Sequence, residues 1–114
     1  MCVVIRKIKD IDFSAAHGGD GRKKELITNK DISNPHFDIL NKDYLLKGHF
    51  FDWHEHKDAD EIAIVLEGKG IYRYKDEYHT KDYMKNDVIL VNAGELHRIE
   101  AQENSMFYFI RIKS

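Results

Sequence analysis

The stretch "GHFFDWHEHKDADEIAIVLEG" (residues 48–68) sets His54, His56 and Glu61 between two glycines. If this stretch begins as a strand, side chains two positions apart point to the same side, about 7 Å from each other. The two imidazoles can then aim their ring nitrogens at one point between them. Glu61 follows the turn "KDAD" (57–60) and can add an oxygen from the neighbouring strand. Three side chains of metal-ligand type are thus encoded close together.

The rest of the chain has the periodicity of strands. Apolar and polar residues alternate in "IYRYK" (71–75) and "MFYFIRI" (106–112), whereas "EIAIVLEG" (61–68) and "DVILVNAG" (87–94) are short apolar runs that end in glycine. Strands of this length, separated by turn residues at roughly ten-residue intervals, favour a sandwich or barrel of antiparallel sheets. We therefore predict an all-β fold, in which the glycine-rich "AAHGGDGRKK" (15–24) forms a loop.

Composition narrows the classes of protein. A chain of 114 residues and 13.4 kDa is typical of one domain, so we expect a single domain over residues 1–114. A formal net charge of −2 does not indicate the basic surface that nucleic-acid binding needs. The apolar runs are far shorter than the ~20 residues of a membrane-spanning helix. The start of the chain lacks a signal-peptide pattern, and the single cysteine, Cys2, agrees with a reducing compartment. We predict a cytoplasmic protein and assign Cys2 no role.

A fourth candidate ligand lies downstream. The segment "NDVILVNAGELHRIE" (86–100) ends an apolar strand in a glycine turn and then delivers His97 at the start of the next strand. An isolated His-X-His pair is weak evidence for a metal site, and His97 strengthens it because ligands often lie where loops meet strands. The remaining histidines lie in predicted loops or at strand ends, where a solvated imidazole is the ordinary case, and none is assigned to the metal: His17, His36, His49 and His79.

The spacing of these residues resembles the motifs of the cupin superfamily. Residues 48–68 match the complete first motif, from Gly48 through the two histidines and Glu61 to Gly68. Residues 86–101 resemble the second motif in weaker form, because it retains Gly94 and His97 but departs from the family pattern at three positions: Asn86, Asn92 and Ala101. Asparagine tolerates the left-handed conformation that glycine often fills, so Asn86 is a plausible replacement.

The resemblance covers residues 37–112 and implies a jelly-roll barrel, or double-stranded β-helix, of two antiparallel sheets with a metal inside. It implies four ligands: His54, His56, Glu61 and His97. We expect one divalent transition metal ion per chain. Iron, manganese, nickel, copper or zinc is favoured over calcium or magnesium because three of the four ligands are nitrogens. Such a set leaves two positions open on an octahedral ion.

Strand alternation predicts the neighbours of the metal. If the strand before His54 is unbroken, Phe51 and Trp53 face away from the barrel interior. The residues then expected to line the pocket are Phe50, Asp52, Ala63, Tyr72 and Ile99, with core packing as the alternative for the aromatic side chains. Asp52 is a weak candidate for a catalytic acid or base, or else a solvated carboxylate near the mouth of the barrel.

Two functions stay open. The first is a metal-dependent enzyme, an oxygenase, decarboxylase or isomerase that acts on a small organic molecule. The second is a non-catalytic protein that binds or senses a small ligand, since "IVLEGKGIYRY" (64–74) also resembles the sensor domains of arabinose-operon-type regulators. The family resemblance implies a homodimer, and the apolar "CVVIRKI" (2–8) could pair with a second copy or cover its sheet.

Overall fold

A computed structural model describes residues 4–16 and 18–114 of the chain. Cys2 and His17 lie outside the described residues. The elements are one 3₁₀ helix and ten strands: η1 (Ile8–Asp10), β1 (Ser14–Ala15), β2 (Arg22–Thr28), β3 (Phe37–Leu45), β4 (Phe50–His54), β5 (Ala59–Glu67), β6 (Lys69–Tyr74), β7 (Thr80–Met84), β8 (Val88–Val91), β9 (His97–Ala101) and β10 (Ser105–Lys113). Among the described residues, no helix is long and apolar enough to cross a membrane.

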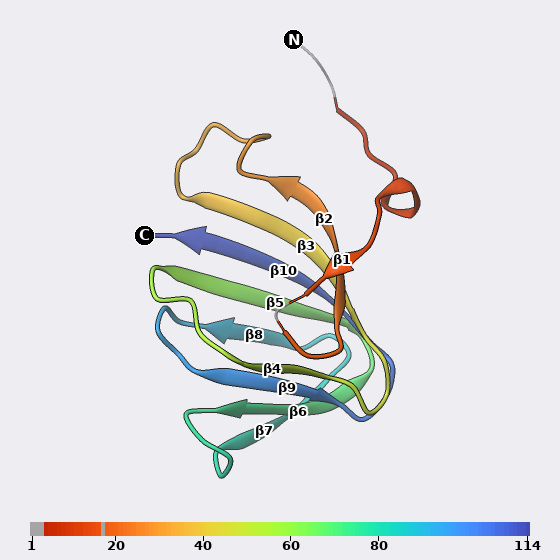
Figure 1. Cartoon of the computed structure of the whole chain (residues 1–114), viewed down its shortest axis with the longest axis vertical. Coiled ribbons are helices and arrows are strands. Elements are labelled where there is room, and N and C mark those ends of the chain that lie inside the picture. The colour runs from red at the N-terminus through yellow and green to blue at the C-terminus, as the bar shows by residue number, and fades with distance from the viewer. Residues whose placement is uncertain (1–3, 17) are drawn as a thin grey trace.

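The strands form two antiparallel sheets (Figure 1). The larger sheet has the order β1-β2-β3-β10-β5-β8, and the smaller has the order β4-β9-β6-β7. Neighbours such as β3 and β10, or β4 and β9, are distant in sequence, which is the connectivity of a jelly roll. The predicted all-β jelly roll is therefore confirmed, and four predicted strands are found as β5, β6, β8 and β10.

The core lies between the two sheets and is largely aromatic. Phe51 of β4 is completely buried, and its ring lies 6.1 Å from that of Phe107 and 6.1 Å from that of Phe109, both on β10. Tyr83 of β7 is also buried, and its hydroxyl lies 2.8 Å from Ser105 Oγ. Aromatic side chains of this size bury more area than any other residue type, so they dominate the cohesion of the sandwich.

A β-bulge in β4 changes which side chains face the core. Phe51 pairs with Ile99 and His54 pairs with His97, so two residues of β4 lie opposite the single residue Arg98 of β9. Phe51 and His54 therefore both face inward, although they are three positions apart.

The alternation predicted for β4 is consequently wrong. Phe50 and Asp52 do not face the interior, because the bulge reverses the parity between Phe51 and His54. The Asp52 side chain is 55% exposed, and the Phe50 ring packs under the Arg98 guanidinium, 4.0 Å from its centroid. Phe51, expected to face outward, is instead at the centre of the core.

The glycine-rich segment runs across β4. Asp20 N donates a hydrogen bond to Phe50 O over 2.9 Å, and a side chain at Gly19 would place its Cβ 2.4 Å from the same carbonyl oxygen. A Cβ at Gly21 would lie 1.9 Å from Phe51 Cε1. The predicted loop is shorter than expected, because Ala15 ends β1 and residues 22–24 begin β2, which leaves Ala16 and residues 18–21 as its described irregular part. Its glycines allow the backbone to approach the strand that leads to His54.

Asparagine does replace glycine at one motif position. Asn86 has φ +76°, in the left-handed region, as its place in the weaker motif predicted. Its backbone N–H donates to Val65 O, and Val65 N donates to Asp87 O. The turn between β7 and β8 is therefore tied to β5, the strand that carries Glu61.

The larger sheet carries apolar side chains over much of its outer face. Register places Leu40, Ile110, Ile62 and Leu90 in one row across four strands. The adjacent row contains Tyr108, Ile64 and Val88 and continues to Lys42 on β3. Val88 and Leu90 are 67% and 59% exposed. The described part of the predicted pairing segment 2–8 is not a strand: residues 4–7 are irregular.

Candidate metal centre

The four predicted ligands lie at one end of the barrel. His54 is the last residue of β4, His56 lies in the following turn, Glu61 is on β5 and His97 begins β9. The turns are joined, because Gly94 N donates to His56 O over 2.9 Å. Pairing of β4 with β9 then sets His54 directly opposite His97.

Three of these side chains converge on one point, and the fourth, His97, lies beside them. One ligand atom from each of His54, His56 and Glu61 lies within 4.8 Å of the others, and this group could hold a metal ion. His56 Nε2 is 3.6 Å from Glu61 Oε2. The His97 ring lies beside the group, with its centroid 4.1 Å from that of His54 and 6.3 Å from that of His56. The structure thus brings all four predicted residues together.

Hydrogen bonds orient two of the imidazoles. His54 Nδ1 lies 2.7 Å from Asp52 O, and His97 Nδ1 lies 2.9 Å from Glu95 O. A carbonyl oxygen only accepts, so Nδ1 carries the proton in both rings and Nε2 keeps its lone pair. The Nε2 atoms are shielded from solvent inside the barrel. This tautomer is the one that a metal ligand requires.

His56 differs from the other two. Its Nδ1 lies 3.4 Å from Arg111 Nη1, and a guanidinium can only donate. Arg111 stands directly across from Glu61 in the β10–β5 register, and its Nε is bonded to Asp38. Coordination through His56 Nε2 requires a proton on Nδ1, which would face this second donor. The Arg111 guanidinium therefore disfavours the tautomer of His56 that could bind a metal through Nε2.

The donor set suits a divalent transition metal. Glu61 and His97 are only 2% and 1% exposed. Three nitrogens with one carboxylate oxygen are ligands that iron, manganese, nickel, copper and zinc accept. The residues present thus fit the ion that the family resemblance implies.

A network of ion pairs on the outer surface of the barrel contacts the bulge in β4. Arg98 Nη1 donates to Asp52 Oδ1 over 2.7 Å, and Arg98 Nε donates to Glu100 Oε2 over 2.8 Å. Arg73 Nε also donates to Glu100 Oε2. The hydrogen bond from Arg73 is the main reason that the pKa of Glu100 is low, with a further contribution from Arg98, although burial opposes it. Asp52 belongs to this outer network rather than to the barrel interior.

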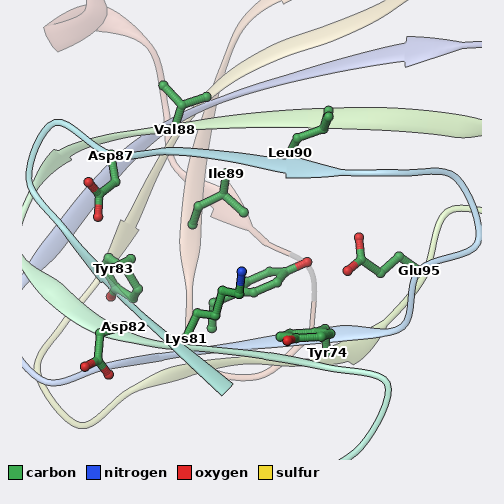
Figure 2. Close-up of a pocket in the computed structure, with 10 residues that line it drawn as sticks. Tyr74, Lys81, Asp82, Tyr83, Asp87, Val88, Ile89, Leu90 and Glu95 are labelled. Carbon is green, nitrogen blue, oxygen red and sulfur yellow. The ribbon is translucent and has the colours of Figure 1, made fainter. Parts of the chain in front are cut away.

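Tyr72 forms the wall between the centre and a cavity. Its ring stacks on His97, with centroids 6.0 Å apart and planes at 25°. Burial raises the pKa of the Tyr72 phenol, and the carboxylates of Glu95 and Glu61 raise it further, so the group stays protonated. The cavity of about 410 Å³ lies where β6 and β7 face β8 (Figure 2). Tyr72 is among the residues that line it.

The other residues predicted to line the pocket lie elsewhere, some in the core and some outside the barrel. Ala63 and Ile99 are buried in the core, at 0% and 1% exposure, and do not line this cavity. Phe50 and Asp52 lie outside the barrel. Sequence reasoning also missed functional neighbours, including Arg111, because cross-strand register is not visible in a pattern of single strands.

Comparison with known proteins agrees with this architecture. The family model described as the cupin domain matches residues 44–112. The chain belongs to the cupin domain family. Three solved structures share the fold of this cupin at low sequence identity. A "predicted oxalate decarboxylase" from Thermotoga maritima has a TM-score of 0.85 at 19% identity, covering 97% of this chain and 100% of its own.

The other two structures are similar. Ectoine synthase from P. lautus has a TM-score of 0.81 at 16% identity, with 97% of this cupin and 78% of that chain covered. An RmlC-like cupin from Shewanella frigidimarina has a TM-score of 0.78 at 14% identity, with 99% and 93% covered. At these identities the likeness shows the fold alone.

Two curated relatives match by sequence. Protein YdbB of Bacillus subtilis (strain 168) is 44% identical over 42% of this cupin and 42% of its own length. Acireductone dioxygenase of Xenopus laevis is 35% identical over 80% of this cupin and 52% of its own length. The chain thus spans about half or less of the curated relatives that it matches.

Proposed function

We propose that this cupin binds one divalent transition metal ion through four side chains: His54, His56, Glu61 and His97. The observation that carries the proposal is their convergence from two sheets, together with the carbonyl contacts that orient His54 and His97. Iron, manganese, nickel, copper and zinc all suit three nitrogens and one carboxylate oxygen.

We further propose that the cupin is a metal-dependent enzyme that acts on a small organic molecule, of oxygenase, decarboxylase or isomerase type. A bound metal of this class supplies Lewis-acid or oxygen-activating chemistry. The protein's own residues exclude water around the ligands, and Tyr72 offers a protonated phenol at the wall of the cavity beside His97. The acireductone dioxygenase relative supports an oxygenase, and a non-catalytic small-ligand binder is the alternative.

The first test is the metal content of untagged protein purified without added metal. A His54→Ala/His56→Ala variant should lose a metal that the wild type holds near one ion per chain. The matched control is His36→Ala/His79→Ala, which removes two imidazoles whose partners are Lys113 O and Asp76. A wild-type protein that is empty and cannot be loaded would refute the metal centre.

The second test is an assay of enzyme activity, and the metal that is found decides which reaction is tried first. Iron calls for oxygen-uptake assays, and manganese calls for assays of decarboxylation of small acids. A fully loaded protein that turns over no candidate, yet binds small molecules, would replace the enzyme with the binding function.

We also propose that the cupin forms a homodimer in the cytoplasm through the outer face of the larger sheet. The adjacent rows that contain Ile62 and Ile64 are apolar on a face where a solvated sheet usually carries polar residues. In a dimer, the same face of a second copy would pack against it, which gives a symmetric interface. The exposed Val88 and Leu90 at its edge support this choice.

A further inference from the structure

The cavity beside the centre contains a buried hydroxyl with no well-formed hydrogen bond in the described part of the chain. Tyr72 is 7% exposed, and its Oη is shielded from solvent without a hydrogen bond of good geometry to any described residue. The Glu95 carboxylate lies near enough to raise the pKa of this phenol, both through its charge and as a hydrogen-bond acceptor, but the contact falls short of a well-formed hydrogen bond. A buried hydroxyl without a well-formed hydrogen bond costs free energy, so a ligand oxygen that accepts a hydrogen bond from it would relieve that cost.

The walls of the cavity suit a carbon skeleton that carries oxygens. Tyr72, Tyr74 and Tyr83 supply aromatic surface, and the rings of Tyr72 and Tyr74 stack with centroids 6.1 Å apart. Figure 2 shows Ile89 pointing from β8 into the space above Lys81 and Tyr74. Aromatic and aliphatic walls with a few polar groups are typical of small-molecule sites.

The charges around the cavity do not favour an anion. Lys81 pairs directly with Tyr72 across β6 and β7, so its amine lies on the same side of the sheet. Asp87 and Glu95 add two carboxylates, whereas Asp82 points away from Ile89 in Figure 2. One cation and two anions give a slightly negative surface, which repels a dianion but not an uncharged molecule.

We propose that this cavity binds an uncharged hydroxy- or oxo-compound, with the Tyr72 hydroxyl donating a hydrogen bond to one of its oxygens. This inference extends the proposed function by naming the class of substrate, and it rests on that function only where the ligand also meets the metal. A small dicarboxylate is disfavoured as the occupant of the cavity.

Saturation-transfer NMR tests the proposal with xylitol as the uncharged probe and succinate as the dianion. Both are titrated into the whole chain as purified and again after metal removal. Xylitol should receive saturation in both forms, and succinate should receive none in the metal-free form, where only the charges of the cavity itself act on it. Tyr72→Phe keeps the ring and should weaken xylitol binding about five- to tenfold, the loss of one hydrogen bond. Ile89→Phe should fill the cavity and abolish binding.

Tyr78→Phe is the matched control, because Tyr78 is 89% exposed and does not line the cavity. Its affinity for xylitol should equal that of the wild type. Absence of xylitol binding, a preference for succinate, or an unchanged affinity in Tyr72→Phe would each overturn the proposal. So would loss of metal from Tyr72→Phe, since Tyr72 would then act on the centre. An empty metal centre with xylitol still bound would refute the proposed metal function but leave this inference intact.

Discussion

Arg98 Nη1 lies 2.7 Å from Asp52 Oδ1, and this contact links the outside of the barrel to the proposed metal centre. Asp52 Oδ1 also accepts a hydrogen bond from Trp53 N–H, and Asp52 O accepts one from His54 Nδ1–H. Arg98 is the residue of β9 opposite the bulge. It therefore braces the irregular backbone that turns His54 inward.

Replacing Arg98 with methionine should weaken metal binding about tenfold, because the partner that fixes a ligand imidazole becomes less well held. Arg73→Met is the control: it removes a guanidinium of the same network, bonded to Glu100 but not to Asp52. A competition titration with a chromophoric chelator measures both affinities. Equal losses in the two variants would show that Arg98 contributes only to general stability.

Removing the Arg111 guanidinium should strengthen metal binding. Arg111→Gln replaces a group that can only donate with an amide whose oxygen can accept a hydrogen bond from His56 Nδ1–H, an effect worth about two- to tenfold in affinity. Lys113→Gln is the control, because Lys113 is on the same strand and also pairs with Asp38. The same competition titration reads the result. Weaker binding in Arg111→Gln would mean that the guanidinium helps to hold His56 in place.

Much of this site could be predicted because its ligands are encoded locally. His54, His56 and Glu61 come from one short stretch, and His97 follows a recognisable glycine turn. Alternation also placed Ala63 correctly inside the barrel, because the inner residues of β5 run in register with β8. The pattern fails where a strand is irregular.

The bulge at Asp52 and Trp53 is such a place. It depends on the register between β4 and β9, which is set by pairing between distant segments, so no local pattern reveals it. The sequence gives a weak indication of the apolar outer face of the larger sheet, because "EIAIVLEG" (61–68) is apolar at successive positions and does not alternate. Such a run indicates a strand covered on both faces.

Gly21→Ala should destabilise the protein by about 1–3 kcal/mol, because the new methyl group would overlap the Phe51 ring. Gly21 is not in the left-handed region, so the cost is steric. Urea denaturation measures it, and the substitution should cost less in a Phe51→Leu background, where the ring is absent. An equal cost in both backgrounds would exclude the ring as its source.

Alkaline pH should destabilise the protein partly through Tyr83. Burial is the main cause that raises the pKa of this phenol to about 12, although its hydrogen bond with Ser105 acts in the opposite direction. A raised pKa favours folding below the unfolded value, near 10, and this contribution is lost as pH rises toward 12. Denaturation from pH 9 upward should therefore be less steep with pH in Tyr83→Phe. Identical slopes would contradict the assignment.

Placing a charge in the proposed dimer interface should separate the subunits. Ile64→Glu introduces a carboxylate into the apolar rows, where its desolvation would be uncompensated in a dimer. Light scattering at micromolar concentration should give a dimer mass for the wild type and a monomer mass for the variant. The control Ile71→Glu lies on the other sheet and should remain dimeric. A monomeric wild type would refute the interface.

The last residue of the chain meets the turn that separates two of the proposed ligands. Ser114 N donates to Asp58 O over 2.9 Å, and Asp58 lies between His56 and Glu61. Any polypeptide joined after Ser114, such as a purification tag or a fluorescent reporter, would therefore start next to the end of the barrel where we propose that the metal binds. A polyhistidine tag there would compete with the protein's own imidazoles, whereas a fluorophore there would be well placed to report on ion binding by quenching.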